Sequence, residues 1–474
     1  MQPSTRITDP PKPSLRIGEV LSALSFALDL AGDQPAGHTI RSCVIGMHIA
    51  SELRMDSAIA SDLFYALLLK DAGNSAGGSK LMRLVGADNA TGRRGGRSKD
   101  WIRSGAQSLT LALSQSTSMY RARVRALSDR ATGREEDPET LQRIRGERGA
   151  DVARQIGLSE RTAKAIQAAK TFSDEPDGLL TSIISLAQQA EISYSLHGSF
   201  DTASGVSGAP TGCSSAPAFD PDVLSAFRTV CSRDIRPDVE NATVRLNELE
   251  PAANGLPAGD FALDNICSAF ADVIDAKSPF TYRHSTRVAG TAVAIARSLG
   301  LNKFEISTLR RAALLHDIGK LSVSNTILDK PGRLTSDECA VIERHPRLSY
   351  EILRRVPGFC GVSEIAAAHH EKLDGSGYFR NLTGCHLSLP ARVLAIANTY
   401  DALTTHRPYR EGLPAHAALS AMARHVPRCF DPFCFEALQQ VTDSHAALTA
   451  DLTRISAQLL PAHLSRDELA GAWL

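Results

Sequence analysis

The chain of 474 residues carries one helical pattern twice, and this repeat limits the folds it can adopt more than any other feature. When the sequence is shifted by about 246 positions, His38 falls on His284 and Asp71 falls on Asp317. The match runs without a gap over 38–73 and includes polar positions, which chance similarity between two amphipathic helices would not preserve. We therefore predict two structural units with the same fold, one in each half of the chain.

The apolar residues recur with a helical period. From Val288 to Gly300 they stand at i, i+3, i+4 and i+7, and the segment stops at a glycine. A second helix is expected from Ile306 to Leu315, and a third from Leu387 to Asp401, with Pro390 in its first turn. Aromatic residues make up only 5% of the chain, which favours helices over sheets. The predicted fold class is all-α, with two tandem helical bundles.

The composition indicates where one unit ends and the next begins. Proline, glycine and alanine are frequent at 250–259, which we interpret as a linker. We predict a first helical domain at 14–247, a second at 258–445 and a C-terminal helical tail at 446–474. A Ser- and Gly-rich loop at 197–218 would lie inside the first domain. The Arg-rich stretch 91–150 reads as a solvated helix face, with a surface for an anionic ligand as the alternative.

Charge and composition argue against several classes of function. The 52 Lys and Arg residues balance the 52 Asp and Glu residues, so neither a nucleic-acid polymer nor an anionic membrane is an expected partner. No apolar run reaches the roughly 18 residues needed to span a bilayer, and the first residues lack the apolar core of a signal peptide. The nine cysteines are scattered without a CxxC pair, which favours buried thiols in a reducing compartment. We therefore expect a cytoplasmic protein.

The second half contains a series of residues that is typical of a two-metal site. The set is His284, His316, Asp317, His345, His369 and His370. A lone His-Asp pair is more often a helix cap or a surface feature, but five histidines spread over several expected helices favour metal binding. Imidazole and carboxylate ligands suit Fe, Mn or Zn, and paired divalent ions activate water for attack on phosphate esters. Asp317 has two oxygens and could bridge the ions, with His284 and His316 on one ion and the other three histidines on the second.

The first half keeps the signals of the fold but not this chemistry. Lys70 stands where the second half has the histidine of its His-Asp pair, and an ammonium group cannot ligate a metal while it is charged. Only His38 and Asp71 remain of the ligand set, and the region around 147–149 takes the place of His345. We interpret this half as a degenerate copy retained for structure, dimerisation or sensing, and His38 as a structural residue.

Together with their flanking motifs, these residues resemble the HD-GYP family over roughly 260–440, and the first half resembles a degenerate HD domain. The motifs stand in the family's order: His316-Asp317-Ile-Gly-Lys320, His369-His370-Glu-Lys-Leu-Asp-Gly-Ser-Gly-Tyr378-Phe379 and Arg407-Pro-Tyr-Arg410. The resemblance implies a metal-dependent phosphodiesterase that opens cyclic di-GMP to linear pGpG and on to GMP in bacterial signalling. It also implies two divalent metal ions, with Fe or Mn expected.

The resemblance further implies roles for residues around the metals. Asp317 and Lys320 would be catalytic, because Lys320 follows the His-Asp pair by about one helical turn and could reach a phosphate oxygen or the leaving group. Tyr378, Arg407 and Arg410 would join Lys320 in binding the substrate, since guanidinium groups form paired hydrogen bonds with phosphates. The alternatives are that Lys320 is solvated, that Tyr378 packs its loop, and that the two arginines make structural salt bridges.

The sequence departs from the family's pattern at three positions. Asn398 stands where the family has an acidic metal ligand, and its amide oxygen is neutral and a weaker ligand than a carboxylate. Phe280 replaces the glutamate of members that hold a third metal, so two ions at most are expected. Phe379 replaces the proline of Gly-Tyr-Pro, which would soften the loop and alter the substrate preference.

Asn398 leaves two other functions open. One is a catalytically impaired protein that binds a cyclic dinucleotide or a protein partner and acts as a signalling module. The other is a phosphohydrolase for another substrate, such as a hybrid cyclic dinucleotide or a nucleotide. The expected ligand is therefore cyclic di-GMP or a related cyclic dinucleotide. We also expect the helical units to pair, either as an intramolecular pseudo-dimer or in a homodimer.

Overall fold

The computed structural model describes residues 15–32, 34–74, 138–170, 178–198, 200, 219–251, 259–330, 332–406 and 411–444. Within these ranges the regular structure is helical, and the isolated β-bridge between Asp374 and Thr383 belongs to no strand. The prediction of an all-α fold is confirmed. Parts of the sequence analysis lie outside the described residues, namely most of the Arg-rich stretch and of the Ser- and Gly-rich loop, the tail at 446–474, Arg407 and Arg410.

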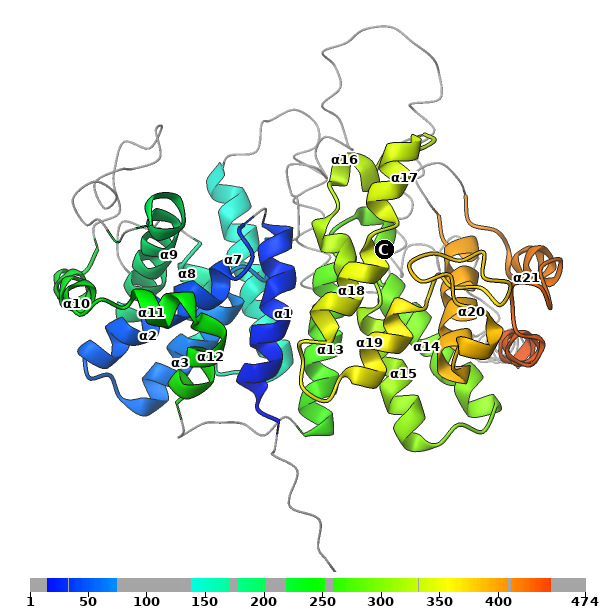
Figure 1. Ribbon diagram of the computed structural model, residues 1–474, viewed down its shortest axis with the longest axis horizontal. Coiled ribbons are helices and arrows are strands. Elements are labelled where there is room, and N and C mark those ends of the chain that lie inside the picture. Colours follow the sequence, from blue (N-terminus) through cyan, green and yellow to red (C-terminus); the bar gives the residue numbers. More distant parts are fainter. Residues whose placement is uncertain are drawn as a thin grey trace, which may run out of the picture.

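The first half forms one helical bundle, drawn in blue to green in Figure 1. Its helices are α1 (Ile17–Ala31), α2 (His38–Glu52), α3 (Ser57–Leu69), α7 (Pro138–Ile156), α8 (Glu160–Ala168), α9 (Leu179–His197), α10 (Pro221–Ser232), α11 (Arg236–Glu240) and α12 (Ala242–Leu249).

The second half forms another helical bundle beside the first (Figure 1). Its α-helices are α13 (Asp260–Asp275), α14 (His284–Ser298), α15 (Lys303–Leu315), α16 (Asn325–Leu328), α17 (Ser336–Ile342), α18 (His345–Leu353), α19 (Cys360–Ala367), α20 (Leu389–Thr404) and α21 (Ala415–Ala423). Its 3-10 turns are η2 (Pro279–Thr281), η3 (Ile318–Ser322) and η4 (Gly384–His386), and a further helix covers 432–444.

Capping residues determine where the helices of the second half begin. α15 starts at a capping box, in which Asn302 Oδ1 accepts from the Glu305 backbone N–H at 3.0 Å and the Glu305 carboxylate accepts from the Asn302 N–H at 2.9 Å. α20 starts behind Ser388, with Pro390 in its first turn, so the helix expected at 387–401 begins two residues later and runs to Thr404. α15 ends at Leu315, which leaves the His-Asp pair at the end of a helix.

The two bundles are built from equivalent helices in the same order. α2 and α14 begin at the matched residues His38 and His284, and α3 and α15 end at the matched residues Leu69 and Leu315. By order and position the other pairs are α1 with α13, α7 with α18, α8 with α19 and α9 with α20. The repeat that was read from the sequence therefore extends to the arrangement of the elements.

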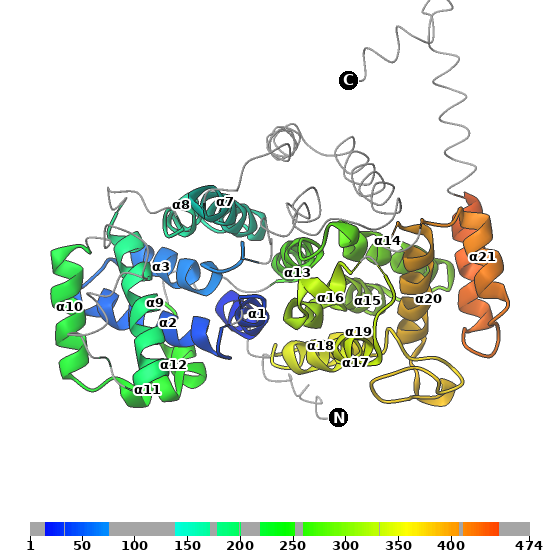
Figure 2. The same ribbon diagram turned by 90° about the horizontal axis from the view of Figure 1, so that it is seen from above.

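The bundles pack against each other through equivalent helices. α7 contacts α13, and α1 contacts α18 and η3 (Figures 1 and 2). Because α1 is equivalent to α13 and α7 to α18, the first two contacts are counterparts of each other, as in an isologous dimer. The Arg355 guanidinium carbon lies 4.0 Å from the centroid of the Phe26 ring, and Gln155 donates to Asp272 at 3.1 Å across the same boundary. The chain is thus an intramolecular pseudo-dimer.

Buried apolar side chains of both bundles form one continuous cluster. It includes Leu24 and Leu28 of α1, Phe270 of α13 and Ile318 of η3, all of them inaccessible to solvent. Because η3 directly follows the His-Asp pair, the first bundle helps to hold the backbone next to that pair. Among the described residues, no helix is both long and apolar enough to cross a membrane.

Candidate metal centre

His284 is positioned by the first turn of α14. Asp275, at the end of α13, accepts from the backbone N–H of Ser285 at 3.1 Å and from its hydroxyl at 2.8 Å. Arg283 has a φ of 53°, so the chain turns sharply just before the helix. His284 is therefore buried at the N-terminus of α14 and faces the interior of the bundle.

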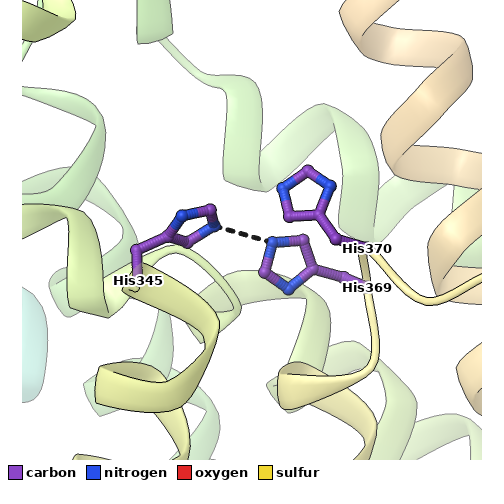
Figure 3. Close-up of side chains that lie close together, drawn as sticks. All are labelled: His345, His369 and His370. Carbon is purple, nitrogen blue, oxygen red and sulfur yellow. Dashed lines mark hydrogen bonds between the residues drawn. The ribbon is translucent and has the colours of Figure 1, made fainter. Parts of the chain in front are cut away.

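Three other imidazoles are each oriented by a hydrogen bond to a nearby backbone carbonyl. The Nδ1 atoms of His316, His345 and His369 lie 2.8, 2.7 and 2.6 Å from the backbone carbonyl oxygens three residues before them. Each Nδ1–H therefore donates to its own chain, which leaves Nε2 with a lone pair. Figure 3 shows two of these rings meeting, with 2.9 Å between the Nε2 atoms of His345 and His369, and His370 beside them.

Asp317 lies between the two groups of histidines. Its Oδ2 is 3.5 Å from His284 Nε2 and 3.4 Å from His316 Nε2. Its Oδ1 is 3.2 Å from His345 Nε2 and 3.6 Å from His369 Nε2. One carboxylate oxygen thus faces each group, which is the arrangement expected of a bridging ligand.

The residues fit a pair of divalent ions. Two sets, His284–His316–Asp317 and His345–His369–His370, each offer ligand atoms that lie within 4.8 Å of one another. His284 Nε2, His316 Nε2 and Asp317 Oδ1 are buried and have no hydrogen-bond partner, which is costly unless they coordinate an ion. Imidazole and carboxylate donors suit Fe, Mn or Zn.

The electrostatics of the site keep Asp317 and four of the five histidines in their metal-binding forms. The exception is His284: burial opposes its protonation, but the hydrogen bonds and charges of Asp317 and Asp401 raise its pKa above the usual value. Burial lowers the pKa of His316 to about 4 and lowers the pKa values of His345, His369 and His370 as well, so these rings are neutral near pH 7. Burial opposes the ionisation of Asp317, but His316 and Lys320 hold its pKa well below the usual range. The carboxylate is therefore charged.

Asp401 of α20 is a functional residue that the sequence analysis did not assign. Its Oδ2 lies 2.6 Å from His284 Nδ1, and its Oδ1 accepts from Arg287 Nε at 2.6 Å. A carboxylate behind a metal-binding imidazole fixes the ring and makes its other nitrogen a better donor. One indirect signal for Asp401 was present in the sequence. Its partner Arg287 is repeated as Arg41 in the first half of the chain.

Asn398 lies on the same side of α20 as Asp401, one helical turn earlier, and is only 7% exposed. This places its amide on the helix face that reaches His284, and its role as a ligand stays a prediction. Phe280, in η2, is buried.

Lys320 and Tyr378 lie beside the histidines. Lys320 Nζ donates to Asp317 Oδ2 at 2.6 Å. The Tyr378 ring stacks on His370 with 4.5 Å between centroids and 24° between planes. The loop after Tyr378 is held by the buried Glu371, whose carboxylate accepts from the N–H groups of Arg380 at 2.8 Å and Leu382 at 3.0 Å. The substrate roles of Lys320 and Tyr378 stay predictions.

Comparison with known proteins gives consistent similarities. The HD domain family matches residues 268–433. The 3'3'-cGAMP-specific phosphodiesterase 3 of Vibrio cholerae is 35% identical over 437 residues, which cover 90% of this chain and 94% of that protein. A cyclic di-GMP phosphodiesterase response regulator of Xanthomonas campestris is 40% identical over 173 residues, which cover 36% of this chain and 46% of that protein.

A solved structure resembles the whole chain. The crystal structure of a cyclic GMP-AMP-specific phosphodiesterase of V. cholerae matches with a TM-score of 0.58 and 30% identity, and the match covers 95% of this chain and 100% of that one. Both bundles, and not only the one with the histidines, therefore have counterparts in a solved protein.

Proposed function

The chain belongs to the HD-GYP family, with a degenerate HD domain ahead of the HD-GYP domain, and on this premise we propose that its preferred substrate is 3'3'-cyclic GMP-AMP. The family makes it a metal-dependent phosphodiesterase that hydrolyses cyclic dinucleotides. The choice among cyclic dinucleotides is supported by the V. cholerae relative that is named for this substrate and matches both bundles.

Cyclic di-GMP, the substrate expected from the family resemblance, is the second candidate. The X. campestris relative named for it is 40% identical, but that similarity is confined to about a third of this chain. Phe379, which replaces a proline of the family's loop and has a φ of 94°, is the residue at which a difference in substrate preference could arise.

We propose that the histidines and Asp317 hold two divalent ions, Fe or Mn, with Asn398 as a neutral ligand of the first. When bound, such ions activate water and stabilise the charge that develops on a phosphodiester. Asp317 holds both halves of the ligand set together. Lys320 places a positive charge next to its carboxylate, where it can bind a phosphate oxygen, and Tyr378 borders the same side of the site.

The observation that carries the proposal of a metal-dependent centre is the convergence of the candidate ligand atoms around Asp317. Three of these atoms are buried without a hydrogen-bond partner. The test uses the full chain, purified without oxygen and loaded with Mn²⁺ or Fe²⁺. It is incubated with equal concentrations of 3'3'-cyclic GMP-AMP and cyclic di-GMP, and linear products are separated by chromatography. We expect faster conversion of 3'3'-cyclic GMP-AMP. Faster conversion of cyclic di-GMP would reverse the assignment.

The matched controls are a ligand variant and a variant of an exposed histidine. Asp317→Asn should abolish product formation with both substrates, whereas His416→Gln on α21, which is exposed and distant in sequence from the ligands, should leave it unchanged. Equal loss in both variants would mean that the activity is not that of this centre.

The alternative of an impaired signalling module rests on Asn398 and has its own test. An additional carboxylate should bind the first ion more tightly, so Asn398→Asp is expected to raise the affinity for Mn²⁺ without creating a new activity. If the natural chain is inactive toward every cyclic dinucleotide and Asn398→Asp switches hydrolysis on, the natural protein is a binding module.

The location we propose is the cytoplasm, where cyclic dinucleotides are made and used as internal signals. The eight cysteines among the described residues form no disulfide, in keeping with a reducing compartment.

A further inference from the structure

A second cluster of buried polar and charged side chains lies in the first bundle, at the position equivalent to the candidate metal centre. It consists of His38, Lys70, Asp71, Glu191 and Lys170, and the first four are at most 3% exposed. The mechanism proposed for the second bundle uses none of these residues. So many buried charges need a specific arrangement of partners, because an unpaired buried charge costs several kcal/mol.

The surroundings of His38 match those of His284. His38 Nδ1 contacts the Glu191 carboxylate, and Arg41 Nε donates to the same carboxylate at 2.7 Å. This repeats the arrangement in which Asp401 joins His284 to Arg287.

The turn that precedes the histidine is repeated as well. Asp29, at the end of α1, accepts from the Thr39 N–H at 3.0 Å and from its hydroxyl at 2.6 Å, as Asp275 does from Ser285. Gly37, with a φ of 82°, takes the left-handed conformation of Arg283. The first bundle thus retains the framework that orients a metal-binding imidazole.

Ammonium groups contact the atoms of the first bundle that would otherwise face metal ions. Lys70 Nζ lies 3.1 Å from His38 Nε2 and contacts Asp71 Oδ2. Lys170 Nζ donates to the other oxygen, Asp71 Oδ1, at 2.8 Å. Each oxygen of Asp71 therefore meets one positive charge, in the same way that each oxygen of Asp317 faces one group of histidines.

Comparison of equivalent positions identifies which histidines of the second bundle are replaced in the first. Lys70 matches His316, and Lys170 follows α8 by the same two residues by which His369 follows α19. A Cβ on Gly73 would lie 1.9 Å from the Arg145 carbonyl oxygen, as one on Gly319 would lie 2.2 Å from the His345 carbonyl oxygen. Arg145, and not the region at 147–149, is thus the counterpart of His345.

We propose that the first bundle is a metal-independent copy of the centre, in which the ammonium groups of Lys70 and Lys170 take the places of the two cations around Asp71. An ammonium group has no lone pair for a metal and repels a divalent ion at this distance. The atoms equivalent to the three unpartnered atoms of the second bundle all have partners here, since His38 Nε2, Lys70 Nζ and both oxygens of Asp71 are bonded.

The charge on Asp71 agrees with this arrangement. Burial opposes the ionisation of its carboxyl, but the charges of Lys70 and Lys170 hold its pKa well below the usual range. The first bundle therefore needs no ion to neutralise its centre and keeps its fold when metal is removed.

The first experiment measures metal in a full chain whose second centre is dismantled by Asp317→Asn, His345→Gln and His369→Gln. After incubation with Mn²⁺ and removal of excess, mass spectrometry should find no Mn²⁺ above the buffer level. Bound Mn²⁺ that disappears when His38→Gln is added would overturn the proposal. Bound Mn²⁺ that persists in that variant lies outside the first bundle and agrees with the proposal.

A second experiment avoids this multiple variant. Hydrogen exchange of the natural chain is followed with Mn²⁺ and after chelation. The amides of α14 and α15 should lose protection on chelation, whereas those of the equivalent α2 and α3 should exchange at unchanged rates. A loss of protection in α2 and α3 that equals the loss in α14 and α15 would show that the first bundle also depends on an ion.

Neutralising the charges of the cluster provides a third readout. Lys70→Met and Asp71→Asn should each lower the melting temperature, by roughly 5–15 °C, because Lys70→Met leaves the Asp71 carboxylate with Lys170 alone and Asp71→Asn leaves both ammonium groups without it. The double variant should melt at a higher temperature than Asp71→Asn, since the more deeply buried of the two ammonium groups is then absent. Additive losses would mean that the two groups do not compensate each other and would contradict the proposal.

Discussion

At the scale of single residues, the site depends on side chains whose second polar atom is already engaged. Four of the five imidazoles bond to backbone carbonyls or, in the case of His284, to Asp401, and so present one defined nitrogen each. A free imidazole could turn or change tautomer, and its metal affinity would fall accordingly. The residues behind the ligands therefore matter to the chemistry almost as much as the ligands themselves.

Replacing Asp401 tests this directly. Asp401→Asn keeps the size of the side chain but weakens its bond to His284, so Mn²⁺ affinity and turnover should fall by about 10–100-fold. Metal titration and initial rates at saturating Mn²⁺ measure the two effects. The matched control is Glu191→Gln, the equivalent change in the first bundle, which should leave both values unchanged. An equal loss in both variants would indicate a general effect on folding.

The pH dependence of stability follows from the lowered pKa of His316. Burial lowers this pKa from 6.5 to about 4, so between these values the unfolded chain binds a proton that the folded chain does not. In chelator, the contribution of His316 to the free energy of unfolding is constant above pH 6.5 and falls by up to about 1.4 kcal/mol per pH unit toward pH 4.

Urea titrations of the natural chain and of His316→Gln, at several pH values in chelator, check this sign. The stability of the variant should depend less steeply on pH over this window. Identical slopes would show that His316 does not titrate as its burial requires.

The convergence of the candidate ligands could be predicted from the sequence because their types and order are distinctive, whereas the residues behind them could not. His284, Arg287 and Asp401 meet only in the folded chain, since α14 and α20 are far apart in sequence. The same holds for Lys170, which touches Asp71 across a gap of 99 residues. The exchange of His316 for Lys70 was visible in the alignment of the two halves, but its pairing with a second lysine was not.

At the scale of elements, the approach of η3 to α18 sets the distance between the two groups of ligands. Gly319 lies so close to α18 that a Cβ would meet the His345 carbonyl oxygen at 2.2 Å and the Ser349 N–H at 2.9 Å. Ser349 also ties the two elements by accepting from the Gly319 N–H at 3.0 Å and donating to the His316 carbonyl at 2.7 Å. The position of Asp317 between the two groups of histidines depends on this contact.

Gly319→Ala should force η3 and α18 apart. We expect a loss of about 1–3 kcal/mol in the free energy of unfolding and a clear loss of metal affinity, measured by urea titration and by Mn²⁺ binding. Gly73→Ala, which meets Arg145 in the same way at 1.9 Å, should destabilise the chain but leave Mn²⁺ binding intact.

A third glycine provides a control in which an added Cβ meets no other atom. Gly290, exposed on α14, has open space around it, and Gly290→Ala should stabilise the chain by about 0.5–1 kcal/mol. Unchanged metal affinity in Gly319→Ala would show that the spacing of η3 and α18 is not critical.

At the scale of the whole molecule, the two bundles behave as a pseudo-symmetric pair with a shared core. The sequence repeat predicted such pairing, but the surfaces involved came only from the structure, because the apolar faces of α1 and α7 look like those of any buried helix. The first bundle supports the second at η3 and α18, the elements that follow or contain candidate metal ligands.

Removing the first bundle should therefore impair the second. A fragment that begins at residue 255 would expose the faces of α13, η3 and α18 that α7 and α1 cover. We expect it to aggregate or to lose most of its metal-dependent activity, as measured by size-exclusion chromatography and by turnover. A soluble, monomeric and fully active fragment would show that the first bundle gives no structural support.

The two lysines of the first bundle have a consequence for the protein in a growing cell. Unlike a bound metal ion, a lysine ammonium group cannot dissociate from the protein, be removed by a chelator or change its oxidation state. Under the proposed assignment, a shortage of metal would empty the second bundle while the first stays folded beside it. Activity would return when the metal supply is restored, without synthesis of new protein.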